Sequence, residues 1–434
     1  MKNSSLYGRI AVLAAGGMLF ACVALMLFGS LEMAGNALFP VLYMTMLFVL
    51  ATALFFFAKK QEDSVALLFQ MAVIAGLLIV RFAMLGHESR DYQVFLSDWL
   101  TQMRDASGWS ALKMDIGDYN MPYLYLLFAL AKLTKFDLYY IKIFSIVFDL
   151  LAAWFAARIV GRKFNQPRTE FAVFATVLAV PTVLLNSAYW GQCDSVFTAL
   201  ALGGLLFALE GKSRRAWLML ALAFSFKLQT IFFVPAFLLL VFLRRIRWQD
   251  AWVFPVGFFA TLVPALVAGK PLADTVSIYI KQTDSYPALE WNAPSVFRIF
   301  GTNGDFEVFN AVGIFLAGTA CAAIFYMLWQ RRAALTEGQL VEAAFLFALV
   351  IPYLLPRMHD RYFFPADVLS VVCFFYDKRR WYLPIAVIGA SYGAYYYYLM
   401  GASELFSPVI ASVALAAVIG ESVARFFKKQ ETAV

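Results

Sequence analysis

The sequence predicts an all-α, polytopic integral membrane protein, and three observations support this fold class. Of the 434 residues, 62% are hydrophobic and only 15% are charged, whereas a soluble domain carries about 25% charged residues. Windows of about 20 apolar residues, long enough to span a hydrocarbon core of roughly 30 Å, recur along the whole chain. These windows lack the two-residue alternation of a membrane β-barrel, so helices must satisfy the backbone polar groups in lipid.

Basic residues orient the predicted helices. The formal charge of +7 would suggest a nucleic-acid surface in a soluble protein, but here the basic residues form short clusters between apolar windows, which places them in the cytoplasm. No nucleic-acid partner is therefore expected. The clusters are Lys2/Arg9, Lys59/Lys60, Arg162/Lys163/Arg168, Lys212/Arg214/Arg215, Arg244/Arg245/Arg247, Arg331/Arg332, Lys378/Arg379/Arg380 and Arg425/Lys428/Lys429.

The apolar windows predict a single transmembrane domain, residues 1–434, with about 11 to 14 helices. The first window begins near Ile10 and lacks a small-residue cleavage site, so we expect a retained helix instead of a signal peptide. Candidate spans cover residues 10–30, 37–58, 64–86, 171–188, 193–209, 250–268, 309–329, 340–356, 362–376, 381–400 and 405–424.

Two stretches do not fit simple spans. Residues 121–160 hold two apolar pieces where the charge pattern requires an odd number of crossings, so one piece is expected to be re-entrant or short. Residues 217–243 are long for one helix and short for two, and Lys227 and Gln229 interrupt them. A broken helix pair that meets at the outer face would reconcile this stretch with basic clusters at both of its ends.

Four polar segments fall on the non-cytoplasmic side under this topology. They are a first external loop, residues 87–120, a turn at 189–195, a second external loop, residues 270–309, and a turn at 356–361. The sequence contains no GxGxxG or Walker A motif, so an activated nucleotide has no evident binding site. The four cysteines are far apart and only two histidines are present, which indicates neither a disulfide framework nor a His-based metal site.

The first external loop has the periodicity of an amphipathic surface helix. Tyr92, Phe95, Trp99 and Met103 recur every three to four residues, so this face is expected to be buried at the membrane interface while Asp98 and neighbouring acids point elsewhere. The simpler interpretation is a solvated linker with an aromatic belt.

Asp91 is the strongest catalytic candidate in this loop. It follows the span that ends near Leu85, beside Arg90 and Tyr92, and Asp118 with Tyr119 begins the next apolar stretch at the same level. Two carboxylates can thus face one cleft. A carboxylate within hydrogen-bond reach can take the proton of a sugar hydroxyl that attacks an anomeric carbon, which predicts Asp91 as the base. The residues predicted to bind the acceptor or the sugar are Arg90, Tyr92, Asp118 and Tyr119.

A second set of residues suits a phosphate. The turn PRMHDRYFFP contains Arg357, His359, Arg361 and Tyr362, and arginine forks match phosphate oxygens. The alternative is a membrane-edge anchor, although basic residues are unusual in an external turn.

Two further polar sites interrupt apolar sequence. Trp190, Gln192 and Asp194 surround a glycine in NSAYWGQCDS, a combination that suits sugar faces and hydroxyls. Lys227 and Gln229 lie in apolar sequence, where an ionisable residue is a functional candidate by default. Both residues are expected to bind the donor phosphate, and a structural pair with Asp194 is the alternative role for Lys227.

These segments resemble the GT-C superfamily of glycosyltransferases, specifically bacterial proteins similar to the mannosyltransferases of GPI-anchor synthesis. The most specific are the two turns with WGQCDS and HDRYFFP. The matching segments, in order, are DYQVF (91–95), GDYNMPYLY (117–125), NSAYWGQCDS (186–195), AFSFKLQ (223–229), WNAPSVFRIFG (291–301) and MHDRYFFPADVLS (358–370).

The resemblance implies a polyprenyl-phosphate sugar donor, a glycan or glycolipid acceptor, and inversion at the anomeric carbon. Asp91 matches the loop acid that is catalytic in that superfamily. Some of its enzymes use a divalent metal such as Mg²⁺ or Mn²⁺, which is left open as a cofactor here. The chain departs from the usual pattern at Asp360, where a Glu is common, and at 120–122, where a Pro pair is usual, so mannose is favoured without being fixed.

Other classes of membrane protein would also be helical and would also carry basic residues on the cytoplasmic side. A transporter or flippase of lipid-linked sugars should show an inverted repeat and midplane helix breaks, and no repeat is evident. A polymerase or ligase acting on polyprenyl-linked glycans is the nearer alternative, but the large early loop is acid-rich. A receptor or scaffold would leave the polar turns unexplained. We therefore expect a hexosyltransferase in a bacterial inner (cytoplasmic) membrane, with its site on the non-cytoplasmic side.

Overall fold

A computed structural model of the protein describes most of the chain. The predicted basic residues Lys59, Lys60, Lys428 and Lys429 lie outside the described residues, as do parts of the second external loop. The described residues are 2–28, 38–58, 64–134, 136–284, 288–300, 306–401 and 407–427.

The described chain is almost entirely helical. Its first half contains α1 (Lys2–Phe28), α2 (Leu38–Ala58), α3 (Ser64–Met84), α4 (Ser97–Asp105), α5 (Met121–Leu133), α6 (Asp137–Phe164), α7 (Pro167–Ala179), α8 (Pro181–Leu184) and α9 (Asp194–Leu209). Its second half contains α10 (Ser213–Phe226), α11 (Val234–Phe242), α12 (Val253–Ala268), α13 (Leu272–Asp284), β1 (Glu290–Trp291), α14 (Phe297–Phe300), α15 (Phe306–Gln330), α16 (Glu337–Leu354), β2 (Met358–His359), α17 (Phe364–Tyr376), α18 (Tyr382–Met400) and α19 (Pro408–Phe427).

The predicted fold class, an all-α polytopic membrane protein, is confirmed. Among the described residues, seven helices are long and apolar enough to cross a membrane, and a bent helix pair is an eighth candidate. Shorter apolar helices accompany them, including Met121–Leu133 and Asp194–Leu209. Each predicted span overlaps a helix, or the bent pair in the case of residues 171–188.

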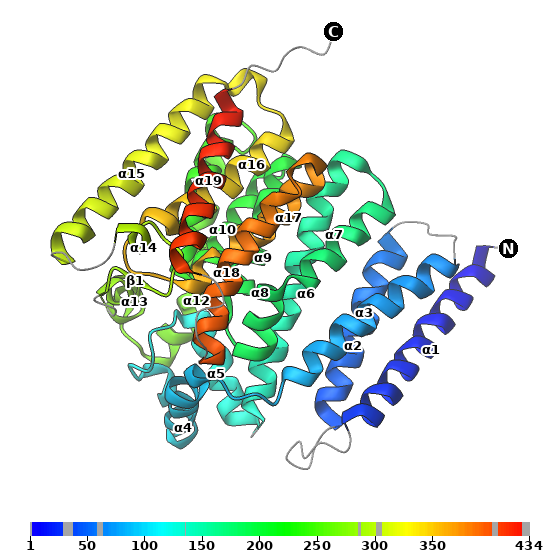
Figure 1. The fold of residues 1–434 in the computed structure, drawn as a ribbon. Coiled ribbons are helices and arrows are strands. Elements are labelled where there is room, and N and C mark those ends of the chain that lie inside the picture. The colour runs from blue at the N-terminus through cyan, green and yellow to red at the C-terminus, as the bar shows by residue number, and fades with distance from the viewer. Residues whose placement is uncertain are drawn as a thin grey trace, which may run out of the picture.

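Figure 1 shows one large bundle with a smaller group of helices at its side. The side group is α1, α2 and α3 (blue), which contact the bundle through α6 and α7. The centre of the bundle includes α6, α9 and α17, and α6 contributes the fully buried Ala152, Ala153, Ala156 and Ala157. Small side chains let membrane helices approach closely, because dispersion contacts drive their association in lipid.

A buried ion pair connects the side group to the bundle. Arg81 on α3 lies 3.3 Å from the Asp149 carboxylate on α6, and both side chains are fully buried. Arg81 also donates to the carbonyl of Leu178 at 2.8 Å, and Ser187 donates to Asp149 at 2.5 Å. Arg81 thereby contacts both α6 and α7, so this network orients α3 against them.

The predicted span at 171–188 is bent in the structure. α7 ends at Ala179, and the continuation from Pro181 to Trp190 turns by 60°. Pro181 lacks a backbone N–H and disfavours the helical conformation of the residue before it, and Val180 has a ψ of 123°. The bend carries residues 185–190, which form a π-helical turn, toward the cavity described below.

Both ambiguous stretches are resolved as expected. α5 is a short helix of 13 residues, whereas α6 is a long one of 28 residues. The stretch 217–243 is a broken helix pair, since α10 ends at Phe226, Lys227 is extended, and a 3-10 turn at 228–233 leads into α11.

The predicted buried face of the first external loop is wrong at Phe95. Met103 is buried as expected and Tyr92 and Trp99 are half-buried, whereas Phe95 is 45% exposed. Leu96 and Leu100 are buried instead. Residues 92–96 form a π-helical turn before α4, and its wider i to i+5 geometry turns Phe95 away from that face. Phe95 thereby becomes available to the cavity.

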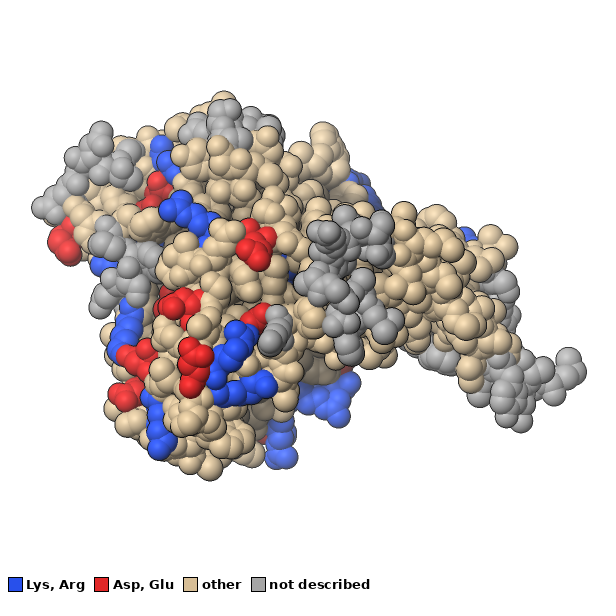
Figure 2. Space-filling model, turned by 90° about the horizontal axis from the view of Figure 1, so that it is seen from below, with Lys and Arg blue, Asp and Glu red and all other residues tan. Residues whose placement is uncertain are grey.

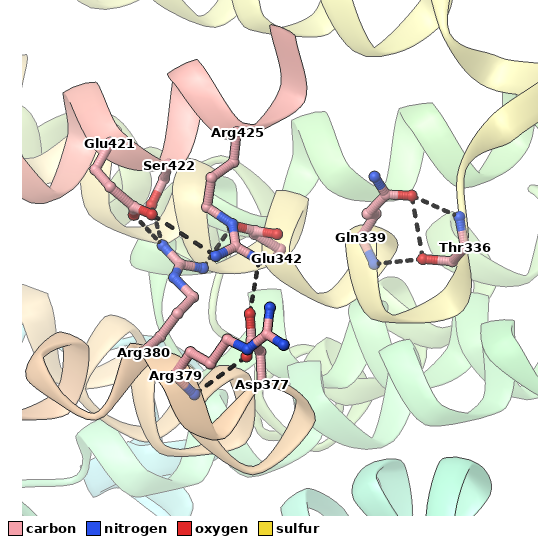
Figure 3. A network of polar contacts seen from close by, with 9 residues as sticks. All are labelled: Thr336, Gln339, Glu342, Asp377, Arg379, Arg380, Glu421, Ser422 and Arg425. Carbon is pink, nitrogen blue, oxygen red and sulfur yellow. Dashed lines mark hydrogen bonds and ion pairs between the residues drawn. The ribbon is translucent and has the colours of Figure 1, made fainter. Parts of the chain in front are cut away.

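A polar network lies at the end of the bundle away from α4 (Figure 3). Arg380 donates to Glu342 on α16 at 2.5 Å and to Glu421 on α19 at 2.5 Å. Arg425 on α19 donates to Asp377 at 2.9 Å. The network ties the beginning of α16 to the ends of α17 and α19. Its basic members Arg379, Arg380 and Arg425 come from two of the clusters predicted to be cytoplasmic.

Candidate functional site

A cavity of about 870 Å³ brings the four predicted polar segments together. All the predicted site residues line it except Tyr92 and Asp194. The polar lining residues include Arg90, Asp91, Asp118, Tyr119, Trp190, Gln192, Lys227, Gln229, Gln282, Asn292, Asn310, Arg357, His359, Asp360, Arg361, Tyr362 and Tyr398. Apolar side chains, among them Phe95, Ile231, Phe232 and Ile314, complete the wall.

The end of the bundle that carries α4 is rich in charges of both signs. Figure 2 shows this face from below, with acidic and basic side chains intermingled over one part of it, whereas the N-terminal helices at the right are nearly uncharged. The polar cavity lining is therefore part of an end of the bundle that carries charges of both signs.

Both oxygens of the Asp91 carboxylate accept hydrogen bonds. Trp190 Nε1 donates to Oδ2 at 3.0 Å, and Gln192 Nε2 donates to the same oxygen at 2.6 Å. The hydroxyl of Tyr398 donates to Oδ1 at 2.5 Å. Each carboxylate oxygen has two lone pairs, so with respect to the described residues one lone pair of Oδ1 remains open.

The backbone before Asp91 is held by two buried side chains. Lys142 on α6 donates to the carbonyl of His87 at 2.5 Å and to that of Met84 at 3.0 Å. Ser89 donates to the carbonyl of Trp190 at 2.7 Å. Asp91 thus follows a segment tied to α6 and to the Trp190 turn, and a fixed backbone is what a precisely oriented carboxylate requires.

The Asp118 to Asn120 segment enters the cavity beside this turn. Tyr119 donates to Gln192 Oε1 at 3.1 Å, and Gln282 on α13 donates to Asn120 at 3.1 Å and also to the carbonyl of Asp118. Gly117 has a φ of +70°, and a Cβ there would lie 3.0 Å from the Trp99 ring. Glycine is therefore required at position 117, where the backbone passes close to the Trp99 ring.

Tyr92 and Asp194 lie outside the cavity lining. Tyr92 packs against the apolar cluster around Leu96 and Leu100, where burial raises the pKa of its hydroxyl to about 12. Asp194 is fully buried behind the cavity and pairs with Lys227 Nζ. It also accepts a hydrogen bond from Asn186 Nδ2 at 3.0 Å.

A small parallel β-ladder shapes the turn with the two arginines. Trp291 of β1 pairs with His359 of β2, and the backbone N–H of Arg357 donates to the carbonyl of Leu289 at 2.8 Å. Arg357 has a φ of +64°, a conformation that costs a non-glycine residue about 1–3 kcal/mol and is concentrated at functional sites. The second external loop is thereby attached to the turn after α16.

Burial controls the charge of two groups in this turn. Burial lowers the pKa of His359 well below its usual value, and the nearby Arg361 and Lys227 lower it further, so its imidazole is neutral at pH 7. Burial also raises the pKa of Asp360 to about 7, although Arg361 opposes the shift. The turn therefore carries the positive charges of Arg357 and Arg361, and the charge of Asp360 changes near pH 7.

Arg361 lies beside Trp190, one of the side chains that contact Asp91. Its guanidinium lies 5.6 Å from the centroid of the Trp190 ring and 5.8 Å from that of Tyr362. Its Nε lies 3.9 Å from Asp194 and has no hydrogen-bond partner among the described residues. Cation–π contacts hold the guanidinium while leaving donors available to an anion.

Two amide oxygens of the cavity are buried acceptors. Gln229 Oε1 and Asn310 Oδ1 have no hydrogen-bond partner within the described part of the chain, and both residues line the cavity. A buried acceptor left unpaired costs about 1–3 kcal/mol. Hydroxyl groups of a bound sugar would supply the missing donors.

Comparison with known families identifies the class of protein. Residues 119–356 match the profile of Glycosyltransferase family 87, a family of the GT-C type. The chain belongs to this glycosyltransferase family. No curated protein matches the sequence.

In sequence order, the family 87 match covers the middle group of the residues that line the cavity. It includes Tyr119, Trp190, Gln192, Lys227 and Gln229. Asp91 precedes the matched residues, and His359, Arg361 and Tyr398 follow them. The described residues contain no group of three His, Cys, Asp or Glu side chains that could hold a metal ion.

Several polar residues of the cavity were missed by sequence reasoning, among them Tyr398, Gln282 and Asn310. Tyr398 lies in a tyrosine-rich run on α18, Gln282 lies on α13, and Asn310 lies on α15. The run AYYYYLM is an unusual signal for a membrane helix and could have indicated a polar contact. Nothing in the local sequence distinguishes Gln282 or Asn310 from ordinary loop and helix-end residues.

Proposed function

We propose that the protein transfers a hexose, with mannose favoured, from a polyprenyl-phosphate carrier to a glycan or glycolipid acceptor. The observation that carries this proposal is one cavity with a carboxylate and a cationic turn in its wall. Asp91 has an open lone pair on Oδ1, and Arg357 and Arg361 line the same space.

The proposed reaction needs one proton acceptor and one anion site. The acceptor hydroxyl gives its proton to Asp91 Oδ1 as its oxygen bonds to the anomeric carbon. The bond from that carbon to the carrier phosphate breaks with its electron pair, and the carrier leaves as polyprenyl phosphate. Attack opposite the leaving group inverts the anomeric centre.

The remaining residues are assigned by chemistry. Arg357 and Arg361 hold the phosphate, since their forked donors match its oxygens, and neutral His359 with Tyr362 completes that wall. Gln229 and Asn310 accept hydrogen bonds from sugar hydroxyls. Tyr119 offers its ring to the sugars, with Arg90, Asp118 and Gln192 at the acceptor side. Trp190, whose ring is buried against Tyr398 and Arg361, instead holds Asp91.

The apolar part of the wall favours a lipid-linked donor over a nucleotide sugar. Val94, Phe95, Ile231 and Ile314 line the cavity beside the charged groups, and apolar side chains suit the first isoprene units of a carrier. A nucleotide donor would instead need a polar base and ribose site.

The donor test uses purified protein with a panel of polyprenyl-phosphate hexoses, matched polyprenyl-diphosphate sugars and nucleotide sugars. Transfer from the monophosphate series alone is expected. Transfer from the diphosphate series would favour the polymerase or ligase alternative, and transfer from nucleotide sugars would contradict the proposal.

We further propose that the cavity faces the non-cytoplasmic side of a bacterial inner membrane. Ser107→Cys and Arg379→Cys, placed singly in a chain without its native cysteines, mark the two ends of the bundle; both parent residues are exposed. An impermeant thiol reagent is expected to label position 107 from outside and position 379 only after permeabilisation. The reverse pattern would place the cavity in the cytoplasm.

A further inference from the structure

Tyr398 makes an unusual set of contacts for a tyrosine near the end of a membrane helix. Its hydroxyl donates to Asp91 Oδ1 at 2.5 Å. Its ring stacks on Trp190 with centroids 5.0 Å apart and planes at 29°. Trp190 in turn donates to Asp91 Oδ2. Each of the three side chains therefore contacts the other two.

A second tyrosine fixes α18 one turn earlier. Tyr395 is fully buried and meets the Trp190 ring edge-on, at 5.2 Å and 90°. Its hydroxyl accepts a hydrogen bond from Asn186 Nδ2 at 3.2 Å. Residues three apart share one face of a helix, so the same face of α18 is held against Trp190 at two points.

The pattern of donors determines how the Asp91 carboxylate is turned. Oδ2 accepts from both Trp190 and Gln192, so its two lone pairs are occupied. Tyr398 is the one donor to Oδ1 among the described residues. Without Tyr398, the carboxylate plane would be restrained from one oxygen only, and the open lone pair would lose its direction.

We propose that Tyr398 is a positioning residue that holds Asp91 Oδ1 with its open lone pair toward the acceptor hydroxyl. This inference rests on the proposed function of Asp91 as the base. Tyr398 also donates a hydrogen bond to the anion, which stabilises the charged carboxylate. It thus affects both the direction and the proton affinity of the base, whereas a purely structural residue would affect neither.

The test compares Tyr398→Phe with Tyr397→Phe in purified full-length protein. Tyr397 is 44% exposed, and the Phe ring at 398 can keep the stack on Trp190. Tyr398→Phe is expected to lower kcat by about tenfold to a hundredfold, the effect of a hydrogen bond to a charged group, with acceptor KM changed less than about threefold. The acid limb of its kcat/KM profile moves to higher pH, while Tyr397→Phe resembles the wild type.

A shape-conserving change provides the second measurement. Replacing Tyr398 with 3-fluorotyrosine gives a more acidic donor of the same shape, so the acid limb is expected to move to lower pH. Equal behaviour of Tyr398→Phe and Tyr397→Phe would overturn the inference. A loss of kcat in Tyr398→Phe with unmoved acid limbs in both Tyr398 variants would also overturn it, because it would reveal a structural role.

The reference variant Asp91→Asn separates this inference from the proposed function. If Asp91→Asn keeps its turnover, the assignment of the base fails, whatever Tyr398 does. If Asp91→Asn is inactive while Tyr398→Phe behaves as the wild type, the positioning role alone fails.

Discussion

Lys227 Nζ forms an ion pair with the Asp194 carboxylate where α10 breaks and α9 begins. The Lys227 side chain is only 8% exposed and that of Asp194 is fully buried. Of the two roles predicted for Lys227, the pairing role is therefore present. Because Asp194 compensates the lysine charge, the net positive charge available to a phosphate comes mainly from Arg357 and Arg361.

Breaking this pair is expected to destabilise the protein. Lys227→Met leaves Asp194 buried without its partner, and the loss of one partner of a buried pair costs about 3–5 kcal/mol. The double variant Lys227→Met/Asp194→Leu should recover much of that loss, since neither charge of the pair remains. Thermal unfolding in detergent measures both, and a Lys227→Met protein with the wild-type unfolding temperature would contradict the expectation.

The arginines of the turn after α16 are expected to govern donor binding. Arg357→Ala and Arg361→Ala should each raise the donor KM at least tenfold, and Lys at either position should restore it poorly because Lys lacks the planar fork. Titration with polyprenyl-phosphate sugar measures the effect. Arg379→Ala, in the polar network at the other end of the bundle, is the matched control, and unchanged donor affinity in both cavity variants would remove the turn from the phosphate site.

Donor binding is also expected to depend on pH through Asp360. Burial raises the pKa of Asp360 to about 7, so the carboxyl is neutral below pH 7 and charged above it. The charged form lies beside Arg361 and repels a phosphate, so donor KM should rise severalfold between pH 6 and pH 8. In Asp360→Asn the donor KM should be flat over this range, and an unaltered pH dependence in that variant would exclude Asp360 as its source.

The raised pKa of Asp360 also makes the stability of the folded protein depend on pH. A carboxyl whose pKa is raised on folding stabilises the folded state fully at pH values below its unfolded pKa of 3.8. That contribution is lost as the pH rises toward 7. Asp360→Asn should therefore gain stability relative to the wild type between pH 4 and pH 8, as measured by unfolding temperature.

Much of the architecture was predictable because lipid imposes strong constraints. Apolar length and basic clusters predicted the spans, and the polar interruption at Lys227 predicted the broken pair of α10 and α11. The polar segments of the cavity were also predictable as a set, since each one interrupts apolar sequence. Their meeting in one cavity agrees with the predicted topology, which places all four segments on one side of the membrane.

What the sequence did not predict depends on tertiary contacts and on register. Tyr398 lies 307 positions from Asp91, and no local pattern connects them. The π-helical turn at 92–96 departs from the ideal helical period and exposes Phe95, which that period places on the buried face. Gln282 contributes through α13, a helix that the sequence left as part of a loop.

The sharpest prediction concerns Asp91. Asp91→Asn keeps the size of the side chain and removes the proton acceptor, so turnover should fall on the order of 10²-fold or more while donor binding persists. A direct transfer assay with separate donor binding measures both quantities. Asp118→Asn should reduce turnover less, because Asp118 is expected only to orient the acceptor.

Asp98 and Asp105 are the matched controls for this experiment. Both lie on α4 and neither lines the cavity, so Asn at either position should leave turnover within about threefold. If Asp118→Asn abolishes transfer while Asp91→Asn does not, the roles of the two carboxylates are reversed. If both variants stay active, no carboxylate of this loop takes the proton, because these are the two loop acids that reach the cavity wall.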